Sequence, residues 1–189
     1  MSGPLRQQRS DGAANRERVL ESAVELVQLR GERVPMAEIA RHAGVGVGTL
    51  YRHFATRDEL LGALVERSFG VALANARAAT AEPGSAIEGV RSFFAATLRD
   101  RHQFVLPLHG GPLVFTATAL ERQADVRTAL QALIDRGQAA GELRADLTPV
   151  DLIVAASSLS QPLPNTQDWD ALARRQIELY VDGVGPPPT

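Results

Sequence analysis

Apolar residues recur three and four positions apart along most of the chain, which is the spacing that places them on one face of an α-helix. The first run contains Val19, Leu20, Ala23, Val24 and Val27, with charged residues between them. Runs that alternate apolar and polar residues, as strands do, are missing, and aromatic residues make up only 5% of the chain. This pattern predicts an all-α fold.

Glycine, proline and capping patterns divide the chain into helices. Two short helices are expected on either side of the turn Gly44-Val45-Gly46. Thr56 and Glu59 form the pattern T-x-x-E, which predicts the start of a longer helix. The full set of expected helices is 15–30, 35–43, 47–54, 56–79, 86–101, 104–107, 113–123, 125–141, 149–160 and 168–183, with loops at 110–112 and 161–165.

The size and composition of the chain exclude several classes of protein. A chain of 189 residues can bury a large core without metal or disulfide staples. The absence of cysteine excludes disulfides, cysteine-bound zinc and thiol nucleophiles. Neither a membrane span nor a signal peptide is expected from the short, interrupted apolar runs, so the expected location is the cytoplasm.

The formal net charge of −2 is the sum of two regions of opposite sign. Residues 1–57 hold nine basic and six acidic residues, a balance of +3, whereas residues 58–189 hold eleven and sixteen, a balance of −5. Every basic residue is Arg, whose planar guanidinium suits phosphate oxygens and guanine edges. The expected organisation is a disordered basic arm at 1–13, an N-terminal domain at 14–57, a larger C-terminal domain at 58–184 and a disordered tail at 185–189.

The two short helices around Gly44-Val45-Gly46 form a candidate helix-turn-helix, a motif in which the second helix enters the major groove of DNA. On a helical wheel of the second helix, Leu50 and Phe54 share the face that a core would bury. The opposite face is predicted to meet DNA. Gly48 would allow close approach, Thr49 would reach a base edge, and Arg52 would reach either guanine or a phosphate. Tyr51 and His53 would contact phosphates.

The residues IARHAGVGVGTLYRHF at 39–54, followed by TRDELL at 56–61, resemble the tetracycline-repressor (TetR/AcrR) family of bacterial regulators. The resemblance covers residues 14–65. Pro35 and Gly46 stand where the family usually has hydroxyl residues at the starts of the two short helices. Arg57 stands where the family commonly has Lys, at a helix N-terminus that suits a phosphate.

The resemblance implies a nine-helix architecture with an N-terminal DNA reader and a C-terminal domain for dimerisation and ligand binding. It implies that Val47, Thr49 and Arg52 face bases, and that Tyr51, His53 and Arg57 hold the DNA backbone. A homodimer would bind a pseudo-palindromic operator and be released by a small ligand. The C-terminal sequence, from 113–116 through 141–146, also resembles the SbtR-like subgroup of regulators.

Two further sets of residues are candidates in the C-terminal domain. A mostly apolar ligand cavity with a few polar groups is predicted to be lined by Phe94, Thr97, Phe104, His109, Phe115, Gln123 and Trp169. A dimer interface is predicted from small and apolar residues of the last two helices, namely Val154, Ala155, Ser158, Leu172, Ile177 and Tyr180. These residues can equally be ordinary core residues.

No metal, cofactor or catalytic site is expected. His102 and His109 lie seven residues apart, but Pro107 and Gly110 interrupt the helix that would bring them together as metal ligands. Serines at 157, 158 and 160 could suggest a hydrolase with Asp151, but no G-x-S-x-G elbow accompanies them. The alternative to a DNA-binding regulator is therefore a helical protein that binds a ligand or partner without specific DNA binding.

Overall fold

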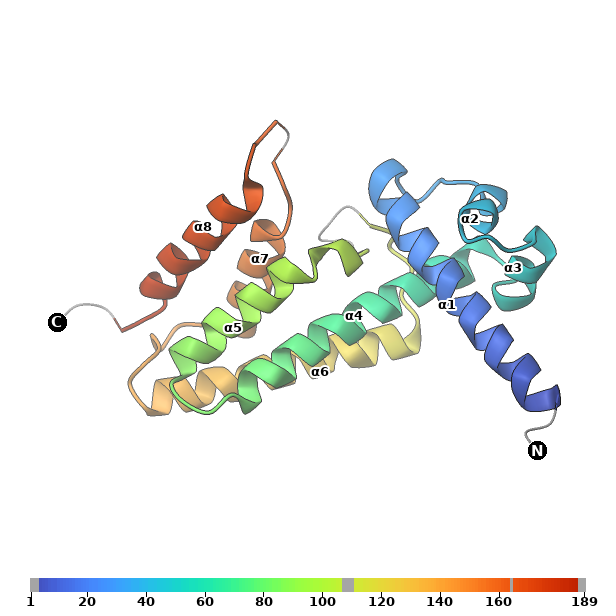
Figure 1. The fold of residues 1–189 in the computed structure, drawn as a ribbon. Coiled ribbons are helices and arrows are strands. Elements are labelled where there is room, and N and C mark those ends of the chain that lie inside the picture. Colours follow the sequence, from blue (N-terminus) through green and yellow to red (C-terminus); the bar gives the residue numbers. More distant parts are fainter. Residues whose placement is uncertain (1–3, 107–110, 164, 187–189) are drawn as a thin grey trace. The chain divides into compact units, whose positions relative to one another are not determined.

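The computed structural model describes residues 4–106, 111–163 and 165–186, and within them it is all-helical (Figure 1). The prediction of an all-α fold is confirmed. Eight α-helices and one 3-10 turn occupy the described residues, which is close to the nine helices expected. The elements are α1 (Pro4–Arg30), α2 (Met36–His42), α3 (Val47–His53), α4 (Arg57–Ala81), α5 (Ala86–Arg99), η1 (Arg101–Gln103), α6 (Ala117–Ala139), α7 (Pro149–Leu159) and α8 (Trp169–Gly183).

The chain forms two compact units, and the N-terminal one is larger than predicted. It comprises residues 1–67 together with 104–116, whereas residues 68–103 and 117–189 form the C-terminal unit. The boundary expected at residue 58 is wrong because the first turns of α4 bury Leu60, Leu61 and Leu64 in the N-terminal core. Segment 104–116 joins the same unit, since Val105 is buried there and Gln28 on α1 donates a 2.9 Å hydrogen bond to the Phe104 carbonyl.

The N-terminal unit is built from α1, α2, α3 and the start of α4. Helix α1 packs against both short helices, and Val19, Ala23, Ile39, Ala40 and Leu50 are almost completely buried between them. The apolar face predicted from the sequence is therefore the face that forms this core.

The expected disordered arm is corrected for the residues that the structure describes, because α1 begins at Pro4. Proline fits the first turn of a helix, where its missing N–H group is not needed. The Ala13-Ala14 pair then favours continuation into a helix that is already nucleated, and one glycine, Gly12, is tolerated. Residues 11–18 are mostly exposed, so this part of α1 is helical with little packing.

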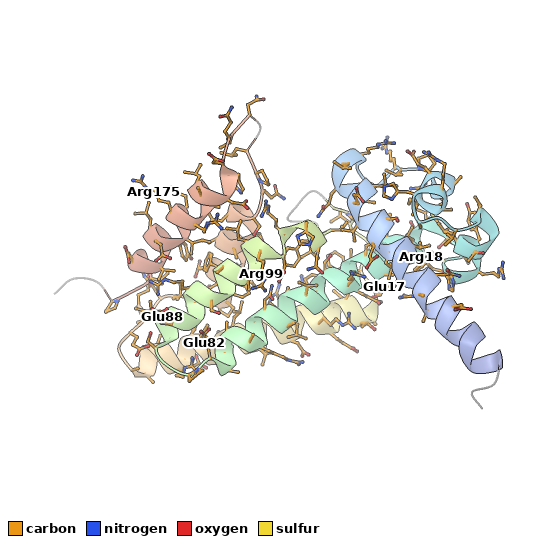
Figure 2. All side chains as sticks on the ribbon, in the orientation of Figure 1. Glu17, Arg18, Glu82, Glu88, Arg99 and Arg175 are labelled. Atoms are coloured by element: carbon orange, nitrogen blue, oxygen red, sulfur yellow. The ribbon has the colours of Figure 1, made fainter. Side chains whose placement is uncertain are left out.

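In the C-terminal unit, α5 packs against α6, α7 and α8, and its aromatic residues form the centre of the core. Phe94 is 1% exposed, and its ring lies edge-on to Phe93 and 5.1 Å from the ring of Tyr180. Figure 2 shows charged side chains such as Glu88 on α5 and Arg175 on α8 projecting from the outer faces of the helices. Within the described residues, none of the helices has the length and apolar content that a membrane span needs.

Three predictions about helices between residues 104 and 141 are also corrected. The two helices expected at 113–123 and 125–141 are one continuous helix, α6, because Ala124-Asp125 contains no helix-breaking residue. Residues 113–116 are not helical, since Val114 and Thr116 are β-branched and follow Pro112. Residues 104–106, the described part of the short helix expected at 104–107, are not helical, and the 3-10 turn η1 lies directly before them.

We predict that Gly89→Ala destabilises the C-terminal unit. A Cβ atom at this position would lie 2.7 Å from Cδ1 of Leu133 and 2.8 Å from the carbonyl oxygen of Ala79. The backbone oxygen cannot move aside cheaply, so overpacking should lower the free energy of unfolding by about 1–3 kcal/mol. Chemical denaturation should measure this loss. Gly183→Ala, where no atom lies within 4 Å, is the control, and equal stability of the two variants would contradict the prediction.

Candidate nucleic-acid interface

A short turn fixes α3 against α2. The N–H groups of Ala43 and Val45 donate to the carbonyls of Ile39 and Ala40 at 2.9 and 3.0 Å, which closes the end of α2. Gly44 has a φ of +64°, a left-handed conformation that glycine adopts without strain. The predicted helix-turn-helix is therefore present in the backbone.

One face of α3 is buried and the opposite face is open. Leu50 is 0% exposed and Phe54, directly after the helix, is 3% exposed. Val47 and Tyr51 are 41% and 48% exposed. Of the other predicted DNA contacts, Gly48 and Arg52 are exposed, and Thr49, His53 and Arg57 are partly buried. All six predicted residues of α3 are thus exposed or partly exposed, although Val47 and His53 lie three residues from Leu50 and so flank the buried face.

The guanidinium of Arg52 lies along α3 itself. Its Nε donates to the Gly48 carbonyl at 3.2 Å, and its Nη2 lies 3.3 Å from Oγ1 of Thr49. These contacts use two of the five N–H donors and hold the side chain against the open face of the helix. The remaining donors are available to an external partner.

Two sets of hydrogen bonds hold the first turn of α4. Thr56 accepts a 3.1 Å hydrogen bond from the Glu59 N–H, and the Glu59 carboxylate accepts one from the Ala55 N–H at 2.8 Å. The predicted cap is present, although Glu59 reaches one residue further back than a capping box requires. Arg57 does not point freely outward, because its Nη1 donates to the carbonyls of Glu32 at 2.8 Å and Val34 at 2.6 Å.

The sequence interpretation missed Arg16 as a residue near the candidate interface. The guanidinium carbon of Arg16, on α1, lies 5.1 Å from the centroid of the Phe54 ring. This cation–π contact brings an exposed cation to the end of α3. No local sequence pattern predicts this contact, because the two residues are far apart in the sequence and meet only through packing.

The predicted ligand-binding residues fall in both units. Phe104 and Phe115 belong to the N-terminal unit, whereas Phe94, Thr97, Gln123 and Trp169 belong to the C-terminal unit. His109 lies outside the described residues. The hydroxyl of Thr97 donates to the Phe93 carbonyl at 2.8 Å, and Nε1 of Trp169 donates to the Leu159 carbonyl at 3.2 Å. A shared ligand site for these residues stays a prediction.

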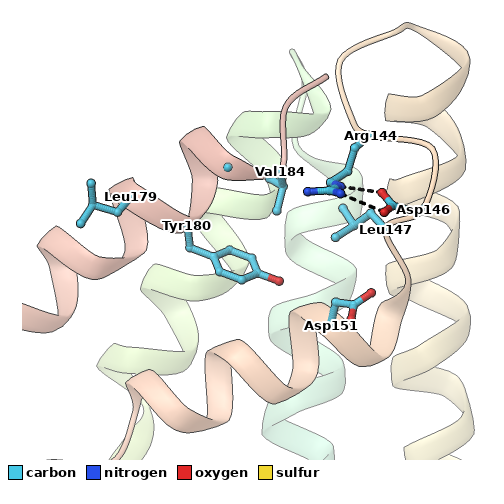
Figure 3. A pocket seen from close by; sticks show the side chains of 8 residues that line it. Arg144, Asp146, Leu147, Asp151, Leu179, Tyr180 and Val184 are labelled. Atoms are coloured by element: carbon cyan, nitrogen blue, oxygen red, sulfur yellow. Dashed lines mark hydrogen bonds and ion pairs between the residues drawn. The ribbon is translucent and has the colours of Figure 1, made fainter. Parts of the chain in front are cut away.

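A different hollow, of about 440 Å³, lies at the end of α8 (Figure 3). Hydrogen bonds from Arg144 lower the pKa of Asp146, and hydrogen bonds from Thr148 lower the pKa of Asp151. Burial, with help from the charge of Asp151, raises the pKa of Tyr180. None of the predicted ligand residues borders this hollow, which is lined by Arg144, Asp146, Leu147, Asp151, Leu179, Tyr180, Gly183 and Val184.

The predicted dimer residues separate into an exposed and a buried group. Val154 and Leu172 are 48% and 38% exposed, and Ser158 is also exposed. Ala155 and Tyr180 are partly buried. Ile177 is corrected: it is 3% exposed and packs in the chain's own core, so it is not available to a partner.

Two further exposed apolar residues lie on these helices. Val150 on α7 is 53% exposed, and Leu179 on α8 is 56% exposed. Val150 lies four residues before Val154, and Leu179 lies seven residues after Leu172, so each shares a helix face with a predicted residue. The sequence interpretation missed Val150, and this periodicity was the signal that could have found it.

Comparisons with known proteins define the family. Residues 19–64 match the family described as "Bacterial regulatory proteins, tetR family", and residues 113–186 match "Transcriptional regulator SbtR-like, C-terminal domain". A TetR transcription regulatory protein from Mycobacterium vanbaalenii is 31% identical, over 94% of this chain and 99% of that chain, with a TM-score of 0.66. The chain therefore belongs to the tetR family, whose members are transcription regulators rather than enzymes.

Other relatives share the DNA-reading region or the fold. An HTH-type transcriptional regulator of Staphylococcus aureus is 38% identical over 64 residues, 33% of this chain, and the matched part is only 35% of that protein's length. A tetR-family protein from Rhodococcus RHA1 is 21% identical over 90% of this chain and 97% of that one, with a TM-score of 0.70. AibR, solved with isovaleryl coenzyme A and operator DNA, is 16% identical over 87% and 97%, with a TM-score of 0.69.

We predict that Thr56→Ala destabilises the N-terminal unit because it removes the hydroxyl that caps α4. Loss of such a cap costs about 0.5–2 kcal/mol. Thr56→Ser keeps the hydroxyl and is the matched control. Thermal unfolding followed by circular dichroism should show a lower Tm for the alanine variant only, and an equal fall in both variants would show that the methyl group, not the cap, is what matters.

Proposed function

We propose that this chain is a transcriptional repressor that binds a pseudo-palindromic operator as a homodimer in the cytoplasm and is released by a small organic ligand. The observation that carries the proposal is the shape of α3. Its core face is anchored by Leu50 and Phe54, while Gly48, Tyr51 and Arg52 remain exposed on the other side and Val47 is exposed at the start of the helix. A helix held in this way can enter a major groove without losing its own packing.

The side chains of this open face suit DNA. Arg52 can donate in parallel to a guanine edge, and the methyl groups of Val47 and Thr49 suit the methyl group of thymine. Tyr51 and His53 can donate to phosphate oxygens on either side of the groove. Membership of the tetR family supports the same roles for these positions.

A homodimer is supported by the apolar surface of the last two helices. Val150, Val154, Leu172 and Leu179 are between 38% and 56% exposed, although large apolar residues of a monomer are usually buried. A twofold axis would bury each copy's patch against the same patch of the other copy. It would also present two copies of α3, as a palindromic site requires.

Release by a ligand is a population shift between dimer conformations that do and do not match the operator. Support for an organic effector comes from the fold neighbour AibR, whose structure holds isovaleryl coenzyme A and operator DNA together. The predicted effector-binding residues remain Phe94, Thr97, Phe104, His109, Phe115, Gln123 and Trp169. No cofactor or metal is part of the proposal.

We predict that Arg52→Ala weakens binding to the cognate DNA by about 1–3 kcal/mol and weakens binding to unrelated DNA much less. The probe is the duplex that the native chain enriches from a random-sequence library. Fluorescence anisotropy at fixed salt should measure both affinities. Arg175→Ala, at an exposed arginine of α8, is the control and should bind like the native chain. An equal loss on both DNAs would make Arg52 a phosphate contact.

We predict that Leu172→Glu together with Val154→Glu converts the dimer into a monomer. Two charges in each copy of a buried apolar patch cannot be solvated, so association should weaken by several kcal/mol. Sedimentation equilibrium should show twice the chain mass of 20.3 kDa for the native protein and the single mass for the variant. Leu120→Glu, at a 51% exposed residue of α6, is the matched control. A variant that remains dimeric would place the interface elsewhere.

A further inference from the structure

Arg57 occupies a position that is electrostatically unfavourable for a free cation. It is the first residue of α4, and the N-terminus of a helix carries a partial positive charge. Its Nη1 donates to two backbone carbonyls of the loop between α1 and α2, those of Glu32 at 2.8 Å and Val34 at 2.6 Å. The partial negative charges of these oxygens offset the unfavourable position.

The two carbonyls lie directly before α2, where the usual helix cap is missing. Pro35 is the N-cap residue of α2, and it makes no side-chain capping bond. Besides the ion pair between Arg30 and Glu38, three other features hold the start of α2. Val34 is 3% exposed and anchors the loop in the core, the ring of Pro35 fixes φ at −61°, and Arg57 binds the carbonyls on the loop side.

We propose that Arg57 is a positioning residue that clamps the start of α2 to the first turn of α4 and so sets the orientation in which α3 meets DNA. The inference rests on the proposed DNA-binding function. It gives Arg57 a different role from the phosphate contact expected from the sequence. The clamp holds the loop at the point where Pro35 makes no side-chain capping bond, and α3 follows α2 through the short turn at Gly44.

The two roles make different predictions about salt. A phosphate contact adds about one to the number of counterions released, so its loss flattens the dependence of affinity on salt and weakens binding to all sequences alike. If Arg57 instead orients α3, its loss disturbs the contacts between the side chains of α3 and the bases. Its loss should lower selectivity between cognate and unrelated DNA and leave the salt dependence unchanged.

The test compares Arg57→Met with Arg33→Met in the full chain. Both variants lose one arginine, but Arg33 is exposed and has no hydrogen bond or ion pair within the part of the chain that the structure describes. The probe is again the duplex that the native chain enriches from a random library, with an unrelated duplex of equal length. Affinities are measured over a series of salt concentrations, at a temperature where circular dichroism shows both variants folded. Arg57→Gln replaces Arg57→Met if the latter does not fold.

Hydrogen exchange of the Glu38 and Ile39 amides supplies a readout that needs no DNA, because both amides bond to the Pro35 carbonyl at the start of α2. For Arg57→Met we expect the ratio of cognate to unrelated affinity to fall about tenfold, the magnitude of a lost charge-assisted hydrogen bond. We also expect an unchanged salt slope and faster exchange of these two amides. Arg33→Met should leave the ratio and the exchange as in the native chain.

The inference is overturned if Arg57→Met weakens binding equally on both duplexes and reduces the salt slope by about one phosphate. Unchanged exchange of the two amides would overturn it as well, because the clamp would then not hold α2. If the native chain enriches no DNA sequence, the proposed function fails, and the exchange measurement alone decides whether Arg57 holds α2.

Discussion

The burial of Leu50 and Phe54 is the constraint on which the DNA-reading arrangement depends. Both residues are almost completely buried, so α3 can turn only one face outward. The N-terminal core that receives them also contains Ile39 from α2 and Leu60 and Leu64 from α4. Since a close-packed core tolerates little displacement, the residues opposite Leu50 are held in one orientation. The chemistry of the open face therefore has a fixed scaffold behind it.

Other hydrogen bonds lie at the starts of the two short helices, where side-chain caps are missing. Pro35 and Gly46 start the two short helices without a side-chain capping bond. The Arg57 guanidinium supplies hydrogen bonds to the loop before α2, and the carbonyl of Gly46 accepts from the Thr49 and Leu50 amides at the start of α3.

The net charge of −2 is consistent with DNA binding by the N-terminal region. It is the sum of a basic N-terminal region and an acidic remainder, which limits unspecific attraction to DNA while local arginines remain available.

Local patterns in the sequence predicted the helix-turn-helix and the all-α class, because glycine turns, caps and apolar spacing act within a few residues. Contacts between distant residues were not predictable in this way. Arg57 reaches carbonyls more than twenty residues away, and segment 104–116 returns to the N-terminal unit although it follows α5. The wrong prediction of Ile177 as an interface residue has the same cause. Its apolar side chain suits a core and an interface equally well, and only the packing of the folded chain shows that it is buried in the core. The helix at 4–13 was missed because propensity alone, without an apolar face, gives a weak signal.

In the proposed homodimer, two copies of α3 read two halves of one DNA site. Selection of duplexes from a random library by the full native chain, followed by sequencing of the enriched pool, tests this arrangement. A dimeric reader should enrich an inverted repeat whose half-sites lie about 34–36 Å apart, one turn of DNA, or a multiple of it. Enrichment of no sequence at low salt, or of a single half-site without symmetry, would contradict it.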